Sequence, residues 1–127
     1  MKAQWCAISL GLTMMASGGL IEVGSDEELR EALVKLQAGT TLKIAPGEYR
    51  GGLAVRGVER LVVDASNPER PPVFVGGANA WQFSRCEELV VRNLVCRGQT
   101  GNGLNIDDGG EMDQPVSGVR IQNVTVL

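Results

Sequence analysis

The chain has 127 residues, 43% of them hydrophobic, and a net charge of −3, which is the composition of one globular domain rather than of a disordered segment. Its 12 basic residues are outnumbered by 15 acidic ones, so it lacks the basic surface that nucleic-acid binding requires. Because histidine is absent, Ser-His-Asp triads and HExxH zinc sites are excluded, and any chemistry must use carboxylates, lysines, arginines or a bound cation.

Residues 1–18 have the layout of a secretory signal peptide. Lys2 precedes an apolar stretch from Trp5 to Met15, and Gly18 is a small residue suited to a cleavage site. The stretch is shorter than the roughly 20 residues of a membrane-spanning helix. We therefore expect cleavage after Gly18, a secreted or periplasmic location, and no membrane anchor in the mature protein. A buried N-terminal helix is the alternative interpretation.

Helix signals follow over residues 26–37. Ser25 can cap the N-terminus, Glu28 completes a capping box, and Gly39 can end the helix. One face of this helix is apolar, formed by Leu29, Ala32, Leu33 and Leu36.

Beyond Gly39 the sequence contains three-residue apolar runs separated by turn residues, with no further helix pattern. The runs begin at residues 42, 53, 61, 73, 81, 89, 94, 104, 119 and 124. We interpret them as ten short strands, which assigns the chain to the all-β class.

These strands repeat along the chain. An offset of 30 aligns Val91 with Ile121, Leu94 with Val124 and Cys96 with Val126. An offset of 28 aligns Leu61 with Leu89 and Val63 with Val91. An offset of 23 aligns Trp81 with Leu104 and Phe83 with Ile106. Self-similarity over 20 to 30 residues indicates a β-solenoid, whose coils bury their apolar faces against neighbouring coils. We expect about three coils over residues 41–127, with the helix covering the open first coil. A Greek-key sandwich, with Asn102-Gly103 closing a hairpin, is the alternative.

Two kinds of side chain have predicted places in the coils. Cys86 and Cys96 could form a disulfide in an exported protein, but the inward position of Cys96 suits a small apolar side chain, so we expect free thiols. Asn93 and Asn123 occupy equivalent places in successive coils, where stacked amides can bond to each other and tolerate a left-handed bend.

In these features the sequence resembles the N-terminal part of the right-handed parallel β-helix proteins of the pectate-lyase-like superfamily. It is similar in particular to exported bacterial right-handed β-helix repeat proteins and to alginate- and chondroitin-lyase-like enzymes. The resemblance covers residues 21–127 and rests on the helix with the turn at residues 46–49, Pro-Gly-Glu-Tyr, and on the coils "LVVRNLVCRG" and "VRIQNVTV". It implies a right-handed parallel β-helix with an N-terminal capping helix. It does not imply one activity, because the superfamily includes lyases, hydrolases, epimerases and proteins without known catalysis.

The acidic stretch "GNGLNIDDGG" at residues 101–110 has three interpretations. In the first, Asp108 pairs with Arg85 one coil away, while Asp107 and the following glycines form a turn. In the second, the loop binds a hard cation such as calcium through Asp107, Asp108, Glu111 and Asp113, with Asn105. The third is direct catalysis by the aspartate pair, which the divergence of neighbouring strand residues disfavours.

Two classes of function remain. As an enzyme, the chain would belong to a polysaccharide lyase-like protein that removes a proton beside a uronate carboxylate, using lysine or arginine with a neutralising cation. As a non-catalytic binding or structural surface module, it would present its coil faces to extracellular glycan. Arg92 and Arg97 are the basic residues available to such an enzyme, but Arg92 also meets Asp64 across coils, which gives it a structural explanation. Because the resemblance implies an active groove formed by later coils, no residue is assigned a catalytic role.

The final stretch, "VRIQNVTVL", shows no closing helix or polar cap after its strands. We therefore expect that the β-helix domain is truncated at its C-terminus, that the catalytic coils are missing from this chain, and that the chain self-associates through the uncapped end.

Overall fold

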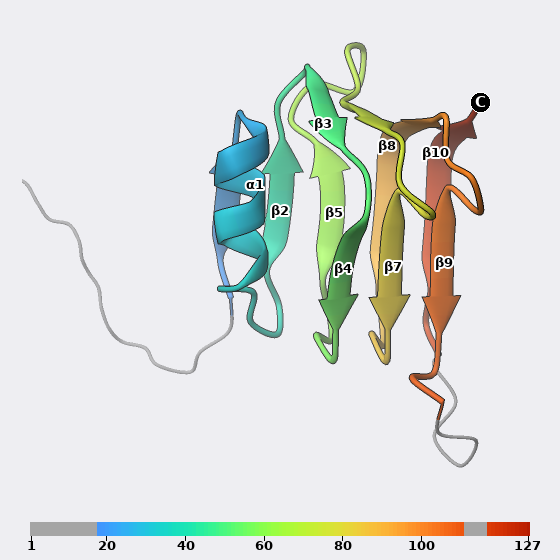
Figure 1. Cartoon of the computed structure of the whole chain (residues 1–127). Helices are drawn as coiled ribbons and strands as arrows, with labels where there is room; N and C mark the ends of the chain where they lie inside the picture. The colour runs from blue at the N-terminus through green and yellow to red at the C-terminus, as the bar shows by residue number, and fades with distance from the viewer. Residues whose placement is uncertain (1–17, 111–116) are drawn as a thin grey trace, which may run out of the picture.

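The structure is a computed structural model that describes residues 18–110 and 117–127. It is a parallel β-solenoid of about four turns, with the helix at one end of the stack (Figure 1). Its elements in chain order are β1 (Leu20–Val23), α1 (Asp26–Leu33), β2 (Thr41–Ile44), β3 (Glu48–Arg50), β4 (Leu53–Arg56), β5 (Val62–Ala65), β6 (Val73–Val75), β7 (Trp81–Ser84), β8 (Val90–Arg97), β9 (Leu104–Asp107) and β10 (Arg120–Val126). The all-β solenoid is confirmed, with about four turns where the sequence analysis expected about three.

The strands form two parallel sheets. The larger has the order β1-β2-β5-β8-β6-β3, with β10 paired to β8, and the smaller has the order β4-β7-β9. The predicted register is confirmed, since Val91 is the partner of both Val63 and Ile121, and Trp81 is the partner of Leu104. Every strand pair among the described residues is parallel, which excludes the Greek-key sandwich.

Two asparagines bend β8 and β10. Asn93 and Asn123 have φ angles of 62° and 53°, in the left-handed region that asparagine tolerates better than most residues. The Asn123 Nδ2 donates to the Asn93 Oδ1 at 2.6 Å, so the predicted amide stacking is confirmed. Because each bend lies inside a continuous strand, the predicted runs at 89 and 94 join in β8, and those at 119 and 124 join in β10.

Helix α1 begins as its capping signals predict. The Ser25 Oγ accepts from the Glu28 backbone N–H at 3.1 Å, and the Glu28 Oε1 accepts from the Gly24 N–H at 2.7 Å. The helix ends at Leu33, four residues before the expected end. Its continuation is replaced by a turn in which the Thr40 hydroxyl donates to the Gln37 carbonyl at 2.7 Å.

Strand β1 was not expected from the sequence. It pairs in parallel with β2, so α1 is an insertion between two adjacent strands rather than a segment that precedes the first coil. The apolar face of α1 still covers the interior of that coil, as predicted, because Leu29 is buried and Leu33 packs against the core. Strand β3 was also missed.

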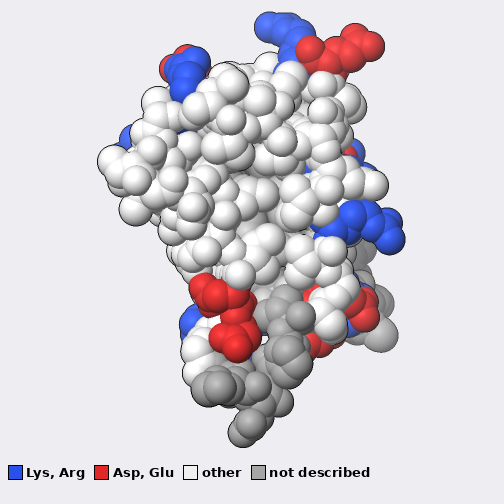
Figure 2. All heavy atoms as spheres, turned by 90° about the vertical axis from the view of Figure 1, so that its right-hand side faces the viewer, with Lys and Arg blue, Asp and Glu red and all other residues white. Residues whose placement is uncertain are grey.

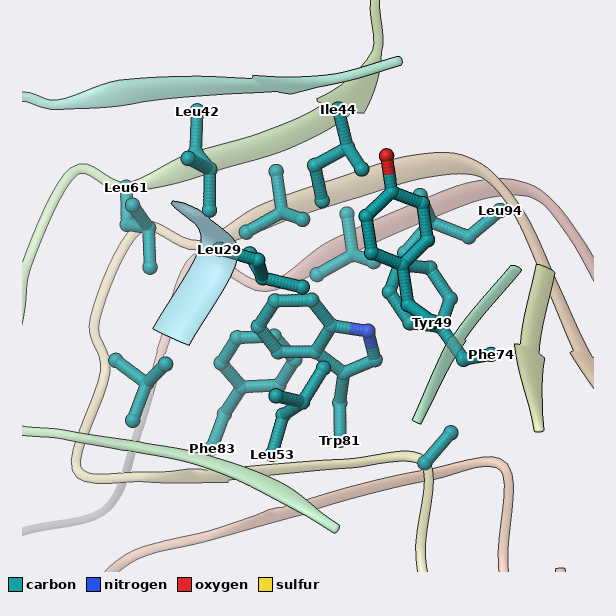
Figure 3. Packing of buried hydrophobic residues seen from close by; sticks show 14 of the residues in the cluster. Leu29, Leu42, Ile44, Tyr49, Leu53, Leu61, Phe74, Trp81, Phe83 and Leu94 are labelled. Atoms are coloured by element: carbon teal, nitrogen blue, oxygen red, sulfur yellow. The ribbon is translucent and has the colours of Figure 1, made fainter. Parts of the chain in front are cut away.

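Four aromatic side chains fill the centre of the core (Figure 3). Trp81 stacks on Phe83 with ring centroids 5.3 Å apart and meets Phe74 edge to face at 5.4 Å, while Tyr49 stacks on Phe74 at 5.5 Å. The buried Trp81 Nε1 has no hydrogen-bond partner among the described residues. It lies on the side of the indole that faces Phe74 and Tyr49, where a ring can act as a weak acceptor.

Cys86 and Cys96 are free and buried, as predicted. Burial raises the pKa of both thiols, that of Cys96 to about 11. Since the thiolate is the reactive form, these cysteines act as small apolar core residues. In the described part of the chain, no helix has the length and apolar composition needed to cross a bilayer.

Candidate functional site

Polar side chains gather on the outer face of the sheet β4-β7-β9. Alternation along the strands buries Trp81 and Phe83 and turns Gln82 outward. In register, Gln82 lies beside Asn105, and Ser84 lies between Arg56 and Asp107. We call this surface the polar face and define it by Arg56, Asn79, Gln82, Ser84, Asn105 and Asp107.

Gln82 is the centre of the hydrogen-bond network on the polar face. Its Oε1 accepts from the Asn105 Nδ2 at 2.7 Å and from the Asn79 Nδ2 at 3.1 Å. Its Nε2 donates to the Asp107 Oδ2 and to the Ser84 Oγ, the latter at 3.4 Å. Both lone pairs and both N–H groups of this amide are therefore used within the protein, which holds the surrounding side chains in fixed positions.

Asp107 has two roles at the end of β9. Its Oδ2 belongs to the network, while its Oδ1 accepts from the Gly109 backbone N–H at 2.7 Å. Asp108 makes a similar bond from the Gly110 N–H at 2.8 Å, and both glycines have positive φ angles. The turn predicted at this place is therefore confirmed.

The predicted ion pair between Asp108 and Arg85 is not established by the geometry. Ser84 and Asp107 are register partners, so Arg85 and Asp108 directly follow the ends of the neighbouring strands β7 and β9. The Arg85 backbone N–H donates to the Asp107 carbonyl at 2.9 Å. The Asp108 carboxylate accepts a hydrogen bond from the Gly110 N–H. The Asp108–Arg85 ion pair stays a prediction.

Arg56 supplies positive charge on the polar face. Its side chain is exposed, and within the described residues it makes no ion pair or hydrogen bond. The guanidinium extends past Ser84 toward the turn, because its Nη2 lies 3.1 Å from the place that a Cβ on Gly109 would occupy. The polar face thus combines amides, a hydroxyl, a carboxylate and a guanidinium cation.

The predicted cation site lies only partly in the described structure. Asp107 and Asp108 are placed as above, whereas Glu111 and Asp113 lie outside the described residues. Within residues 18–110 and 117–127, no group of three or more His, Cys, Asp or Glu side chains is arranged to hold a metal ion. Asn105 donates its amide to Gln82. Calcium binding by this loop therefore stays a prediction.

Arg92, considered above for catalysis, belongs to a structural charge cluster on the other sheet. The nearly buried Asp64 accepts from the Arg92 Nε at 3.0 Å, the Lys43 Nζ at 2.9 Å and the Asn93 Nδ2 at 2.9 Å. Burial alone would raise the pKa of Asp64, but the hydrogen bonds from Lys43, Asn93 and Arg92 outweigh it, so this pKa lies below its ordinary value. The predicted Arg92–Asp64 contact is confirmed.

The sequence analysis missed the polar face. The signal was present, because the offset of 23 that aligns Trp81 with Leu104 also aligns Gln82 with Asn105. Two amides at one outward position of successive coils indicate a hydrogen-bonded pair in the same way that Asn93 and Asn123 do. What the alignment could not give is the contribution of Asn79, which lies before β7.

Comparison with protein-family models, with curated proteins and with solved structures finds no match.

Proposed function

We propose that this protein is an exported β-solenoid that binds extracellular glycan through the polar face. The proposal rests on one observation, the hydrogen-bonded row of amides and Asp107 centred on Gln82. Sugar hydroxyls both donate and accept hydrogen bonds, and they are matched by amides and carboxylates that present both kinds of group.

Preorganisation supports this function. A binding surface whose side chains are already fixed loses little conformational entropy when the ligand arrives. The network leaves hydrogen-bonding groups free for a ligand, since the second N–H and the oxygen of the Asn105 amide form no hydrogen bond with the described residues. The Asp107 carboxylate has further lone pairs.

The charge on the polar face suggests an acidic glycan. Arg56 is exposed and forms no ion pair with the described residues, and a guanidinium binds a carboxylate in a bidentate manner. Arg56 and Asp107 are separated in register by Ser84, so an acidic sugar could contact the cation while its hydroxyls meet the amides. We also propose a distant relationship between this chain and the polysaccharide lyases of the pectate-lyase-like superfamily. The capping helix and the asparagine bends support that relationship.

Binding is favoured over catalysis by the composition of the face. It holds one carboxylate among its described residues, and that group already accepts two hydrogen bonds in the network and the turn. A general base must be able to reach a substrate proton and to leave its resting partners. A non-catalytic glycan-binding module is therefore the function that the arrangement supports best.

The test is titration calorimetry with a panel of neutral and uronate-containing oligosaccharides. Gln82→Ala should weaken binding at least about tenfold, which corresponds to about 1.4 kcal/mol, because Asn79, Asn105 and Asp107 lose the amide that holds them in place. The matched control is Gln122→Ala, which removes an exposed outward amide from β10 on the other sheet. Absence of binding to every glycan, or equal loss in both variants, would overturn the proposal. Arg56→Gln should weaken only the uronate-containing ligands.

A further inference from the structure

The hydrogen bonds of the polar face run in one direction, because a fixed group stands at each end of the network. At one end the Asn102 backbone N–H, which can only donate, bonds to the Asn79 Oδ1 at 3.1 Å. At the other end the Asp107 carboxylate, which can only accept, bonds to the Gln82 Nε2 and to the Gly109 N–H. The Asn79 and Gln82 amides between these ends therefore have one orientation each.

This direction decides which groups Asn105 presents to a ligand. Because the Gln82 Oε1 can only accept, the Asn105 Nδ2 must face it, and the two atoms are 2.7 Å apart. The Asn105 Oδ1 then has no hydrogen-bond partner among the described residues. Two residues further along β9, about 6.6 Å away on the same face, the Asp107 carboxylate keeps lone pairs that its two hydrogen bonds do not use. We call the Asn105 Oδ1 and the Asp107 carboxylate the acceptor pair.

The acceptor pair requires ligand groups that donate. A sugar hydroxyl donates its hydrogen, whereas a hydroxyl oxygen that carries an acyl or alkyl group has no hydrogen to donate. If such a substituted sugar lay on the face, the lone pairs of Asn105 and Asp107 would lose water without gaining a hydrogen bond, which is costly. A ligand carboxylate is unsuitable at the same place, because it would stand against the like charge of Asp107.

A cation lies beyond the acceptor pair along β9. Arg56 belongs to β4, but its Nη2 lies 3.1 Å from the place that a Cβ on Gly109 would occupy, so the guanidinium reaches the turn that follows β9. Figure 2 shows charged side chains of both signs at the lower edge of the molecule, the edge toward which β9 runs in Figure 1. Asn105, Asp107 and the guanidinium therefore follow one another along one line of the face.

We infer that the polar face selects a uronic-acid sugar whose hydroxyls are unsubstituted. The acceptor pair accepts from two of the sugar hydroxyls, and the Arg56 guanidinium binds the carboxylate. The inference rests on the proposed function and adds to it a position for the acid group and the rejection of glycans with O-acyl or O-alkyl groups. Amides that were free to turn could offer an N–H to a substituted oxygen, so the selection depends on the fixed direction of the network.

Calorimetry with one uronic-acid oligosaccharide in two forms tests the selection. The two forms carry the same carboxylates, and in one of them the hydroxyls are O-acetylated. The wild type should bind the acetylated form at least about tenfold more weakly, since a site that hydrogen-bonds a hydroxyl rejects an analogue that lacks it. Arg56→Gln should weaken the binding of both forms by the same factor, because both carry the carboxylate.

Asn105→Ala removes one member of the acceptor pair. It should weaken the binding of the free form more than that of the acetylated form, so the ratio of the two affinities should fall toward one. A purely structural effect at Asn105 would lower both affinities and leave their ratio unchanged. The control is Gln122→Ala, which removes an exposed amide from the other sheet and should change neither affinity.

The direction of the network can be measured without a ligand. In NMR spectra of the free protein, a scalar coupling across the hydrogen bond should connect the Asn105 Nδ2 with the Gln82 Cδ. A coupling between the Gln82 Nε2 and the Asn105 Cγ would show the opposite direction and would overturn the inference.

Failure of this inference and failure of the proposed function give different results. Equal binding of the two forms by the wild type, or an equal loss for both forms in Asn105→Ala, would overturn the selection and leave glycan binding intact. Absence of binding to either form would overturn glycan binding itself, and the selection with it.

Discussion

Replacing Asp64 by asparagine should destabilise the solenoid, because this carboxylate joins three successive strands. Its side chain is 4% exposed and accepts hydrogen bonds from Lys43 on β2 and from Arg92 and Asn93 on β8. The Asp64→Asn variant keeps the shape of the side chain but replaces one acceptor oxygen by an N–H group that faces cations.

The magnitude follows from the burial of the partners. Removing one member of a fully buried ion pair costs about 3–5 kcal/mol, mainly through the unpaired charge that is left. Here the Lys43 and Arg92 side chains are 31% and 40% exposed, so water can solvate them in the variant. One acceptor oxygen also remains. We therefore expect a loss of about 2–3 kcal/mol in the free energy of unfolding at pH 7.

The loss should depend on pH. The pKa of Asp64 is lower in the folded protein than its ordinary value of 3.8. Its contribution to stability is therefore fully present above the unfolded-state pKa and is lost as the pH falls through the folded-state pKa. The difference between wild type and Asp64→Asn should be constant above about pH 5 and should shrink below about pH 4.

Urea unfolding between pH 3 and 7, followed by the fluorescence of the buried Trp81, measures both effects. Glu22→Gln is the control, because it is the same chemical change at an exposed position of the same outward column and should alter stability by less than about 0.5 kcal/mol. A cost below about 0.5 kcal/mol for Asp64→Asn, or a cost independent of pH, would show that the reasoning about this cluster is wrong.

Three other predictions concern the bend at Asn93, the signal peptide and the acidic loop. Asn93→Ala should destabilise the protein by about 1 kcal/mol more than Asn93→Gly, because glycine keeps the left-handed bend at φ 62°; equal losses in urea unfolding would contradict this. Mass spectrometry of the exported fraction should find a chain that begins after Gly18, and an intact Lys2 there would refute export with cleavage. Millimolar calcium should raise the melting temperature by no more than a few degrees, and a shift above about ten degrees that Asp107→Asn removes would establish a stronger site.

The parts of the fold that depend on repeated side chains could be predicted from the sequence. The register followed from apolar residues whose offset is the same throughout each pair of neighbouring strands, and the bends followed from Asn93 and Asn123, because asparagine is a residue type associated with both stacking and positive φ. By contrast, Arg60 and Glu88 also have positive φ angles, 55° and 53°, at equivalent places before β5 and β8. Their residue types carry no such signal, so those bends could not be predicted from the sequence.

Strands β1 and β3 were missed because neither has the complete apolar pattern of a strand. Strand β3 contains one buried residue, Tyr49, between two exposed charged residues, and β1 is followed directly by a helix signal at Ser25. Both are strands because a neighbouring coil offers a strand edge. The polar face depends on the same long-range pairing, since Gln82 bonds to Asn105 and Asp107, 23 and 25 residues further along the chain, only where β7 pairs with β9.

The column of outward residues Glu22, Lys43, Asp64, Arg92 and Gln122 bears on how the coils find their order during folding. The inward column beside it, Ile21, Leu42, Val63, Val91 and Ile121, is aliphatic throughout, so hydrophobic burial alone would let almost any coil stack on any other. The charges remove that ambiguity. If β2 skipped β5 and paired with β8, Lys43 would lie against Arg92 with no carboxylate between them. The alternation of sign therefore disfavours misordered coils through like-charge repulsion, an effect distinct from its contribution to the stability of the finished stack.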